Sequence, residues 1–109
     1  MVCGEVSALR GIFNGTTNFI LDEMLHGRAY ADALLEAQDR GIAEADPSLD
    51  VGGWDTAAKL VIAANTFADE KITLADVHVS GIEDVRADRL EQCRRDGSVL
   101  KLVATAELV

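Results

Sequence analysis

The chain has 109 residues, 49% of them hydrophobic and 27% charged, a composition typical of a soluble globular domain. Nineteen acidic and ten basic residues give a formal net charge of −9, which repels phosphate backbones and argues against nucleic acid as a partner. The sequence shows neither an apolar run long enough to cross a bilayer nor a secretory signal. Its two cysteines, Cys3 and Cys93, are too few for a disulfide framework or a structural zinc site. We therefore expect a cytoplasmic protein without a membrane or nucleic-acid partner.

The first part of the chain predicts a strand followed by two helices. Residues from about Glu5 to Phe13 are typical of a strand. The segment Asn14 to Thr17 then breaks the strand pattern and offers side chains that can cap a helix. The apolar positions that follow predict a helix ending at Gly27. A second helix, amphipathic, is predicted from about Tyr30 to Arg40, with Gly41 after it.

A third helix, predicted from Trp54 to about Ala68, is apolar on nearly every side, which is typical of a buried helix. The segment before it, from Ala43 to Gly53, is predicted to be a polar loop. The helix has four polar positions that we expect close to one narrow stripe at helical spacing: Asp55, Thr56, Lys59 and Thr66. Such a stripe on a buried helix suggests that it faces a cleft.

The last third of the chain predicts further elements. Thr73 to Asp76 resembles a capping box that opens a short helical turn. Val77 to Ile82 alternates as a strand does, Asp84 to Asp96 is typical of a charged helix closed by Gly97, and Ser98 to Val109 predicts a strong strand. The basic residues of that helix alternate with acidic ones, so we expect a solvated face. These are Arg86, Arg89, Arg94 and Arg95.

The order of the elements predicts an α/β or α+β fold, with one small sheet, mostly antiparallel or mixed, and helices packed on one face. Three strands leave exposed sheet edges, and pairing of two copies through the sheet is one way to cover them. We therefore expect a homodimer. His26 and His78 have no partner at metal-ligand spacing, so we expect no metal site. Trp54 is expected to be a packing anchor.

The stretch from Gly41 to Lys59 carries the candidate chemistry. Asp55 and Lys59 are four residues apart and share one helix face, and Glu44, Asp46 and Asp50 precede the helix start, where negative charge is favourable. An isolated pair of this kind is usually a weak surface ion pair. A lysine partly shielded from water beside carboxylates can instead act as a general acid or base. Spacing alone predicts a cleft with a lysine and carboxylates and leaves both interpretations open.

Two segments of the chain strongly resemble homoserine dehydrogenase. One runs from Asn14 to Ile20 (NGTTNFI), and the other is a long pattern with fixed gaps from Gly41 to Lys59. The positions that carry the second pattern are Gly41, Ala43, Glu44, Ala45, Asp46, Pro47, Asp50, Gly53, Asp55, Ala57 and Lys59. The resemblance covers essentially the whole chain. It implies NAD(P)-dependent interconversion of L-homoserine and L-aspartate 4-semialdehyde, a step of threonine and methionine biosynthesis.

The resemblance also implies roles for individual residues. Lys59 is implied as the proton donor to the carbonyl oxygen, with Asp55 orienting and polarising the substrate hydroxyl. Glu44 is implied to bind the ammonium group of the substrate, with support from Asp50. Two further positions are implied to lie on the substrate side of the turn after the first strand, where a helix N-terminus suits a carboxylate: Gly15 and Thr16.

Two neighbouring positions and one missing motif depart from the family pattern. Ala58 stands where an arginine is frequent, and Ile42 stands where an aromatic residue is common, which puts fine affinity in doubt more than reaction type. The chain has no Gly-x-Gly-x-x-Gly segment after a strand, which a dinucleotide site needs. We therefore interpret residues 1–109 as a single catalytic-like domain of a longer enzyme, with NAD(P) bound elsewhere and no activity of its own. The alternative is a non-catalytic module of the same origin that binds an amino acid or dimerises.

Overall fold

The structure is a computed structural model that describes residues 8–67 and 71–107. Its elements, in chain order, are β1 (Ala8–Gly11), α1 (Gly15–Leu25), α2 (Tyr30–Asp39), α3 (Ser48–Val51), α4 (Trp54–Phe67), the 3₁₀ turn η1 (Leu74–Asp76), α5 (Ala87–Asp96) and β2 (Ala104–Glu107). The two strands pair antiparallel, with Ala8 opposite Glu107 and Gly11 opposite Ala104. The mixed α and β fold predicted from the sequence is therefore confirmed, with a two-stranded antiparallel sheet in the described residues.

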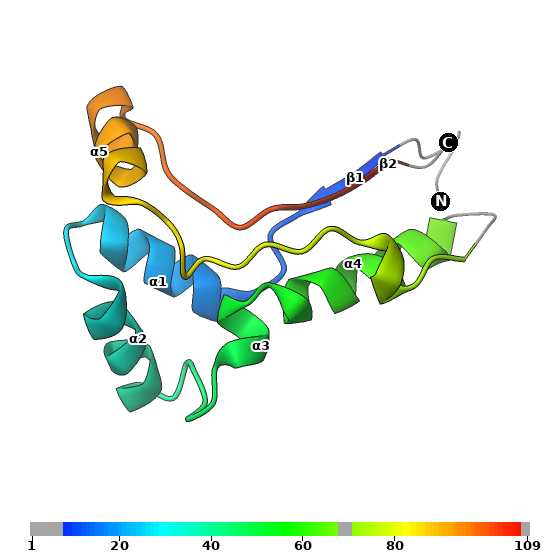
Figure 1. Cartoon of the computed structure of the whole chain (residues 1–109), viewed down its shortest axis with the longest axis horizontal. Helices are drawn as coiled ribbons and strands as arrows, with labels where there is room; N and C mark the ends of the chain where they lie inside the picture. Colours follow the sequence, from blue (N-terminus) through cyan, green and yellow to red (C-terminus); the bar gives the residue numbers. More distant parts are fainter. Residues whose placement is uncertain (1–7, 68–70, 108–109) are drawn as a thin grey trace.

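The elements form an open rather than a spherical arrangement. Helices α1, α2 and α5 gather at one end, and the β1–β2 ribbon extends from them with α4 running along it (Figure 1). The radius of gyration is 15.7 Å, against ~13 Å for a compact domain of this length. In the described part of the chain, no helix has the length and apolar character needed to cross a membrane.

The predicted helix ends are largely confirmed. Asn14 caps α1, and its side-chain oxygen accepts a hydrogen bond from the backbone N–H of Thr17 at 2.8 Å. Helices α1 and α2 stop just before the predicted positions, α5 ends at Asp96 as predicted but begins at Ala87 rather than Asp84, and the glycine that follows each helix has a positive φ. Both bonds of the predicted capping box at η1 are present as well. Local side-chain chemistry therefore defines these boundaries.

The predicted strand from Val77 to Ile82 is wrong, because this segment has no strand partner in the structure. Val77 and Val79 are half-buried while His78 and Ser80 are exposed, so the alternation reflects packing on one side of an irregular segment. Its end is fixed by one hydrogen bond from the Ile82 N–H to the Val51 carbonyl, at 2.8 Å.

The strand predicted from Ser98 to Val109 is shorter than expected. Only Ala104–Glu107 is a strand among its described residues, because β1 ends at Gly11, opposite Ala104. The chain then leaves the sheet to begin α1, so residues 98–103 have no β1 partner. The first predicted strand is likewise confirmed over Ala8–Gly11, while residues 5–7 and 108–109 lie outside the described residues. The predicted polar loop from Ala43 to Gly53 contains the short helix α3.

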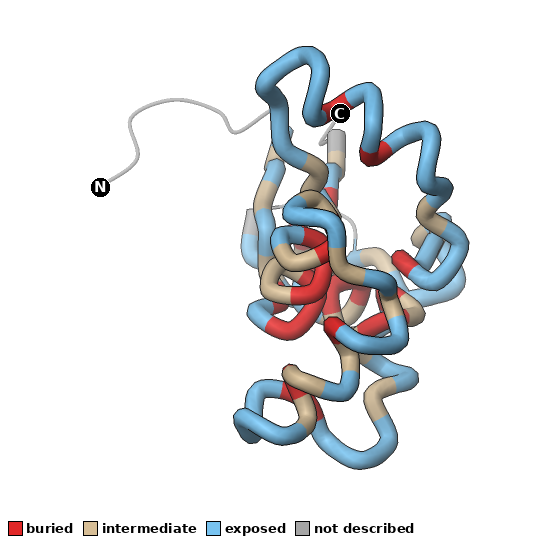
Figure 2. The backbone as a smooth tube through the Cα atoms, turned by 90° about the vertical axis from the view of Figure 1, so that its left-hand side faces the viewer, coloured by how far each residue is buried: buried red, intermediate tan, exposed pale blue. Residues whose placement is uncertain are grey.

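The core is built around α1. Ile20 and Leu21 are fully enclosed, and they belong to a cluster with residues of α2, α3, α5 and the loop before α5. Figure 2 shows buried residues along the middle of the molecule and exposed residues on the outer turns. The buried members of the cluster are Ile20, Leu21, Met24, Ala33, Ala37, Ala43, Val51, Ile82 and Leu90.

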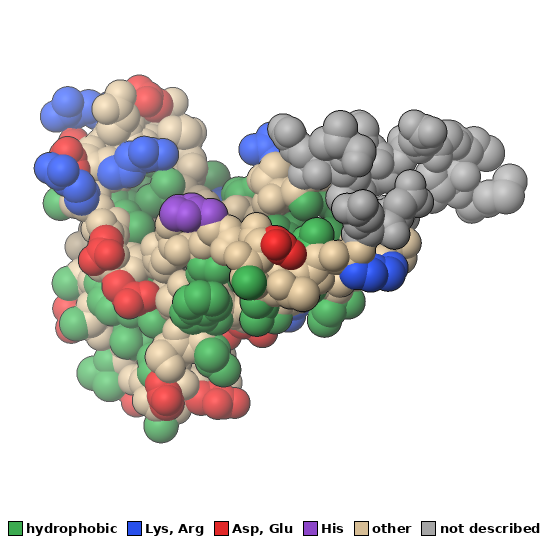
Figure 3. Space-filling model, turned by 45° about the vertical axis from the view of Figure 1, so that its right-hand side comes forward, with side chains coloured by type: hydrophobic (Ala, Val, Ile, Leu, Met, Phe, Trp, Pro, Cys, Tyr) green, Lys and Arg blue, Asp and Glu red, His purple; other side chains and the backbone are tan. Residues whose placement is uncertain are grey.

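Helix α4 is buried on one face only, so the predicted burial on nearly every side is wrong for this chain. Ala57, Leu60 and Ala64 are buried at helical spacing, and α4 contacts β2. Ile62 is 69% exposed and Trp54 is 48% exposed, which is more than a packing anchor would show. Hydrophobic side chains accordingly reach the surface in patches among charged groups (Figure 3).

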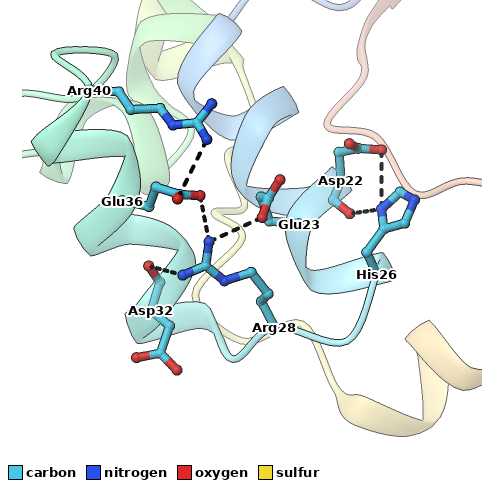
Figure 4. Close-up of polar contacts among 7 residues, drawn as sticks. All are labelled: Asp22, Glu23, His26, Arg28, Asp32, Glu36 and Arg40. Atoms are coloured by element: carbon cyan, nitrogen blue, oxygen red, sulfur yellow. Dashed lines mark hydrogen bonds and ion pairs between the residues drawn. The ribbon is translucent and has the colours of Figure 1, made fainter.

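Ion pairs join the facing ends of α1 and α2. Arg28, in the turn between them, bonds Glu23 of α1 at 3.2 Å and also contacts Glu36 of α2 (Figure 4). Arg40 pairs with the same Glu36 at 3.5 Å, and its guanidinium lies 5.5 Å from the centre of the Phe19 ring. The two helices are therefore held by charge as well as by their apolar faces.

Arg94 of α5 also binds the C-terminal end of α1. Its guanidinium donates to the carbonyls of Leu25 at 2.6 Å and Met24 at 2.9 Å. These carbonyls lie in the last turn of a helix, beyond the regular intrahelical donors, although the Met24 carbonyl also accepts the Gly27 N–H at 3.0 Å. The predicted solvated face is confirmed, since Arg86, Arg94 and Arg95 are exposed and ion-paired. Arg94 in addition caps a helix far away in the sequence, which the prediction did not include.

Replacing Arg94 with alanine tests this cap. The Arg94→Ala variant leaves two helix-end carbonyls without their charged donor, and it should lower the free energy of unfolding by about 1–3 kcal/mol. Arg95→Ala is the matched control, because Arg95 is 77% exposed and makes one ion pair; its effect should stay within about 0.5 kcal/mol. Urea unfolding followed by circular dichroism measures both. Equal effects of the two substitutions would contradict the capping role.

Gly53 offers a second test, at the turn that leads into α4. It has φ +87°, and a Cβ there would lie 2.6 Å from the backbone oxygen of Ser80. Gly41 has φ +74° with open space around it, so Gly41→Ala should cost only the left-handed strain of about 1–2 kcal/mol. Gly53→Ala should cost about 1–3 kcal/mol more, from the added clash. Urea midpoints of the two variants give the comparison, and equal midpoints would show that the contact with Ser80 relaxes freely.

Candidate functional site

The candidate site is organised by Asn14, at the junction of β1 and α1. Its Oδ1 is occupied by the Thr17 N–H, so its Nδ2 faces away from the helix. That nitrogen donates to Asp50 Oδ1 and to Asp55 Oδ2, at 2.8 Å each. Asn14 is only 7% exposed. One buried amide therefore joins the first turn of α1 to two carboxylates from α3 and α4.

The start of α1, the short helix α3 and the first turn of α4 meet at this point. Asp50 lies in the short helix α3, which Gly52 and Gly53 separate from α4. Asp55 lies in the first turn of α4, whose Ala57 N–H bonds the Gly53 carbonyl at 3.0 Å. The sharp turn at Gly53 thus brings carboxylates of consecutive helices to the same amide.

Lys59 lies one turn further along α4. Its Nζ is 3.0 Å from Asp55 Oδ2, and it donates to the backbone carbonyl of Phe13 at 2.8 Å. The side chain is 49% exposed, and that of Asp55 is 32% exposed. Hydrogen bonds from Asn14 and Lys59, together with the Lys59 charge, hold the pKa of Asp55 below its ordinary value. The contact with Phe13, 46 residues away, sets this pair apart from an ordinary surface ion pair.

The two predicted residues at the start of α1 take different positions. Thr16 is buried, and its hydroxyl donates to the Ile42 carbonyl at 3.1 Å, which ties the loop after α2 to α1. Gly15 is exposed at the first helical position. Their backbone N–H groups belong to the first helical turn, where no intrahelical acceptor exists. The hydroxyl of Thr16 thus has a structural partner, while the backbone donors stay free for a ligand.

Glu44 does not join the cluster. Its side chain is exposed and contacts none of Asp50, Asp55 and Lys59, while its backbone carbonyl accepts from Gln38 at 3.1 Å. Asp46 accepts from the Ser48 N–H at 3.2 Å, and bonds from the hydroxyl and N–H of Ser48 hold the pKa of Asp46 below its ordinary value. Asp46 therefore fixes the turn into α3, within the segment predicted to be a polar loop.

The predicted cleft beside the polar stripe of α4 is only partly matched. Asp55 and Lys59 lie on the more exposed side, whereas Thr56 is buried on another side, so it does not belong to their stripe. Thr56 borders a hollow of about 560 Å³ between α4, η1 and β2. Asp55 and Lys59 do not line this hollow, and the pair is open to solvent.

Asn14 is the site residue that the sequence analysis missed, since it was interpreted only as a helix cap. Its amide supplied a usable signal. An N-cap uses the carbonyl oxygen of asparagine and leaves two N–H donors, which need acceptors once the side chain is buried. Lys101 was also missed; its Nζ donates to Asn18 Oδ1 at 2.7 Å, in the first turns of α1.

The assembled groups are suited to proton transfer and to binding a small cation. Two carboxylates and one ammonium leave one net negative charge, and an ammonium can donate a proton to an oxygen. Within residues 8–67 and 71–107, no three His, Cys, Asp or Glu side chains lie close enough together to hold a metal ion. The ammonium donor beside a carboxylate favours acid–base chemistry on a polar substrate.

Comparisons with known proteins point to one family. The chain matches the family described as homoserine dehydrogenase over residues 2–109. It is 44% identical to the NAD(+)-dependent homoserine dehydrogenase of Pseudomonas canavaninivorans, covering 94% of this chain and 29% of that protein. A crystal structure of S. aureus homoserine dehydrogenase superposes with a TM-score of 0.88 at 38% identity, covering 94% of this chain and 27% of the other.

A more distant structure, a hyperthermophilic archaeal homoserine dehydrogenase mutant in complex with NADPH, has a TM-score of 0.77 at 29% identity, covering 94% of this chain and 28% of the other. The chain thus spans less than a third of the length of these relatives. With a family match across residues 2–109 and a fold shared with solved members, the chain belongs to the homoserine dehydrogenase family.

Proposed function

We propose that this chain is the substrate-binding and catalytic part of an NAD(P)-dependent homoserine dehydrogenase, which interconverts L-homoserine and L-aspartate 4-semialdehyde. The observation that carries the proposal is the contact series Asn14–Asp55–Lys59, which holds a lysine beside a carboxylate at the N-terminal end of α1. Membership of the family supplies the reaction type. We place the reaction in threonine and methionine biosynthesis on the same ground.

Lys59 is the proposed proton donor. An ammonium group has three N–H donors, and two of them are taken up by Asp55 and the Phe13 carbonyl. The third is free to reach a substrate oxygen, because the side chain is 49% exposed. Reduction of the aldehyde adds hydride to carbon and a proton to oxygen, and Lys59 supplies the proton; in the reverse direction, the amine takes it back.

Asp55 orients Lys59 and the substrate hydroxyl in this proposal. Its carboxylate stays ionised because Asn14 and Lys59 lower its pKa, so it accepts hydrogen bonds throughout the working pH range. Asp50 shares the Asn14 amide and adds a second negative charge beside it. An amino-acid substrate carries an ammonium group, which these charges attract.

Glu44 and the start of α1 are proposed to bind the two ends of the amino-acid group. The exposed Glu44 carboxylate has no partner among the described residues, and it is available for the substrate ammonium. The free backbone N–H groups of Gly15 and Thr16 suit the substrate carboxylate, since a helix N-terminus favours an anion.

The nicotinamide cofactor does not fit the residues of this chain. A dinucleotide site needs a glycine-rich turn between a parallel strand and a helix, whereas the described strands are antiparallel and no such motif follows either of them. We therefore expect a separate part of a longer enzyme to hold NAD(P), which supplies or accepts the hydride. The related proteins, more than three times as long, have room for that part.

The first experiment compares the chain alone with a completed enzyme. The completed enzyme replaces the matching segment of the Pseudomonas canavaninivorans protein with this chain. We expect NAD(P)-dependent oxidation of homoserine by the completed enzyme and none by the chain alone. If the chain alone is active, the cofactor proposal is wrong. If the completed enzyme binds NAD(P) and homoserine without turnover, a non-catalytic binding module is the better description.

Substitution of Lys59 in the completed enzyme tests the proton-donor role. Lys59→Ala should reduce kcat by about 10²–10⁴-fold, the usual contribution of a general acid. Lys59→Arg keeps the charge but holds its proton too tightly to donate it, so its kcat should fall by a similar factor. Lys71→Ala is the matched control, since Lys71 is exposed and, among the residues that the structure describes, bonds the Asn65 carbonyl. Full activity of Lys59→Arg would limit Lys59 to an electrostatic role.

A further inference from the structure

We propose that Asn14 is a positioning residue of this site: its buried amide bridges Asp50 and Asp55 and thereby fixes the carboxylate that orients Lys59. The inference rests on the proposed function for its kinetic consequences, while the bridge itself is testable by spectroscopy on the chain alone. The geometry is the pair of 2.8 Å hydrogen bonds from Asn14 Nδ2 to the two carboxylates.

The orientation of the Asn14 amide is determined by the helix that it caps. Its Oδ1 accepts the Thr17 N–H at 2.8 Å, and its backbone carbonyl accepts both the Asn18 N–H and the Thr17 hydroxyl. Turning the amide over would place its oxygen against two carboxylates and its NH₂ against an N–H donor. The cap therefore forces both donors of the amide toward Asp50 and Asp55.

The β1–α1 junction bonds to both Asp55 and Lys59. The Phe13 carbonyl accepts from Lys59 at 2.8 Å, and the next residue, Asn14, donates to Asp55 at 2.8 Å. The same oxygen of Asp55 receives Asn14 and Lys59. Two adjacent residues, Phe13 and Asn14, thus fix the distance and direction between Asp55 and Lys59. A flexible surface ion pair has no such additional contacts.

The bridge also separates two like charges. Asp50 and Asp55 both approach a single nitrogen, and two carboxylates this close repel each other unless a donor lies between them. The amide supplies one N–H to each. Without it, the two side chains are expected to move apart, or one of them to take up a proton, and in either case Lys59 loses its oriented partner.

Two variants separate the bridge from the cap. Asn14→Ser keeps a good N-cap but has no amide to reach the carboxylates. Asn14→Asp also keeps the cap and the size, but it places a third carboxylate against the other two. Thermal unfolding followed by circular dichroism serves as the control for the cap: the Asn14→Ser midpoint should stay within a few degrees of the original, whereas the Asn14→Asp midpoint should fall further, because three carboxylates then share one buried junction. Thr17→Ala, which removes a hydroxyl bond in the same turn and leaves the amide intact, is the matched structural variant.

The direct readout is the pKa of Asp55, measured by ¹³C NMR titration of the aspartate carboxyl groups in the 109-residue chain. The hydrogen bond from Asn14 is the largest cause of the lowered pKa of Asp55, so Asn14→Ser should raise this pKa toward its ordinary value. Thr17→Ala should leave it in place. An unchanged Asp55 pKa in Asn14→Ser would overturn the proposal.

The kinetic readout uses the completed enzyme. In Asn14→Ser, the acidic limb of the pH–kcat profile should move to higher pH, and kcat should fall about tenfold to a hundredfold, as a misplaced catalytic group does. Asn14→Asp should lose more activity at neutral pH and recover part of it in acid, where a protonated carboxyl can again donate. Wild-type kcat and pH profile in both variants would overturn the positioning role. A completed enzyme that never turns over homoserine would instead overturn the proposed function, whatever the titration shows.

Discussion

The structure depends on how the polar groups at the start of α1 are satisfied. A chain that leaves a strand to begin a helix exposes N–H groups without acceptors, and burial makes each of them costly. The side-chain oxygen of Asn14 accepts from one of these N–H groups, that of Thr17. The side-chain NH₂ of Asn14 is then itself a buried donor that requires acceptors. Carboxylates from α3 and α4 meet the second need. The relative placement of three helices therefore follows from the hydrogen-bonding requirements of one buried amide.

This arrangement keeps negative charge where a buried junction would ordinarily exclude it. Asp55 is stabilised as a carboxylate by an amide and a lysine, and Lys59 gains a backbone carbonyl as well. These partners within the fold stabilise the charged forms in addition to water, since both side chains of the pair are partly exposed. Under the proposed function, a contact series that the fold itself holds in place reduces the reorganisation that catalysis requires.

Local features were predictable from the sequence, and distant contacts were not. The helix ends and the facing of Asp55 and Lys59 depend on residues within four positions of each other, so caps and helical spacing were sufficient. The Asn14 bridge joins residues 36 and 41 positions apart, and the Arg94 cap spans 69. No pattern in the sequence marks such partners. The false strand at Val77–Ile82 has a related cause, since alternating burial occurs without a strand partner.

The exposed face of α4 explains why its predicted burial was wrong and yet informative. Residues at i, i+4, i+7 and i+11 on this face are Asp55, Lys59, Ile62 and Thr66, so Ile62 lies on the same stripe as the catalytic candidates. Ile62 is 69% exposed, and a single exposed hydrophobic side chain is common on protein surfaces. The spacing correctly placed Asp55, Lys59 and Thr66 on one face, because helical periodicity depends only on the positions along one helix. Apolar composition did not predict burial, because burial depends on which elements pack against the helix, and that is set by contacts distant in the sequence.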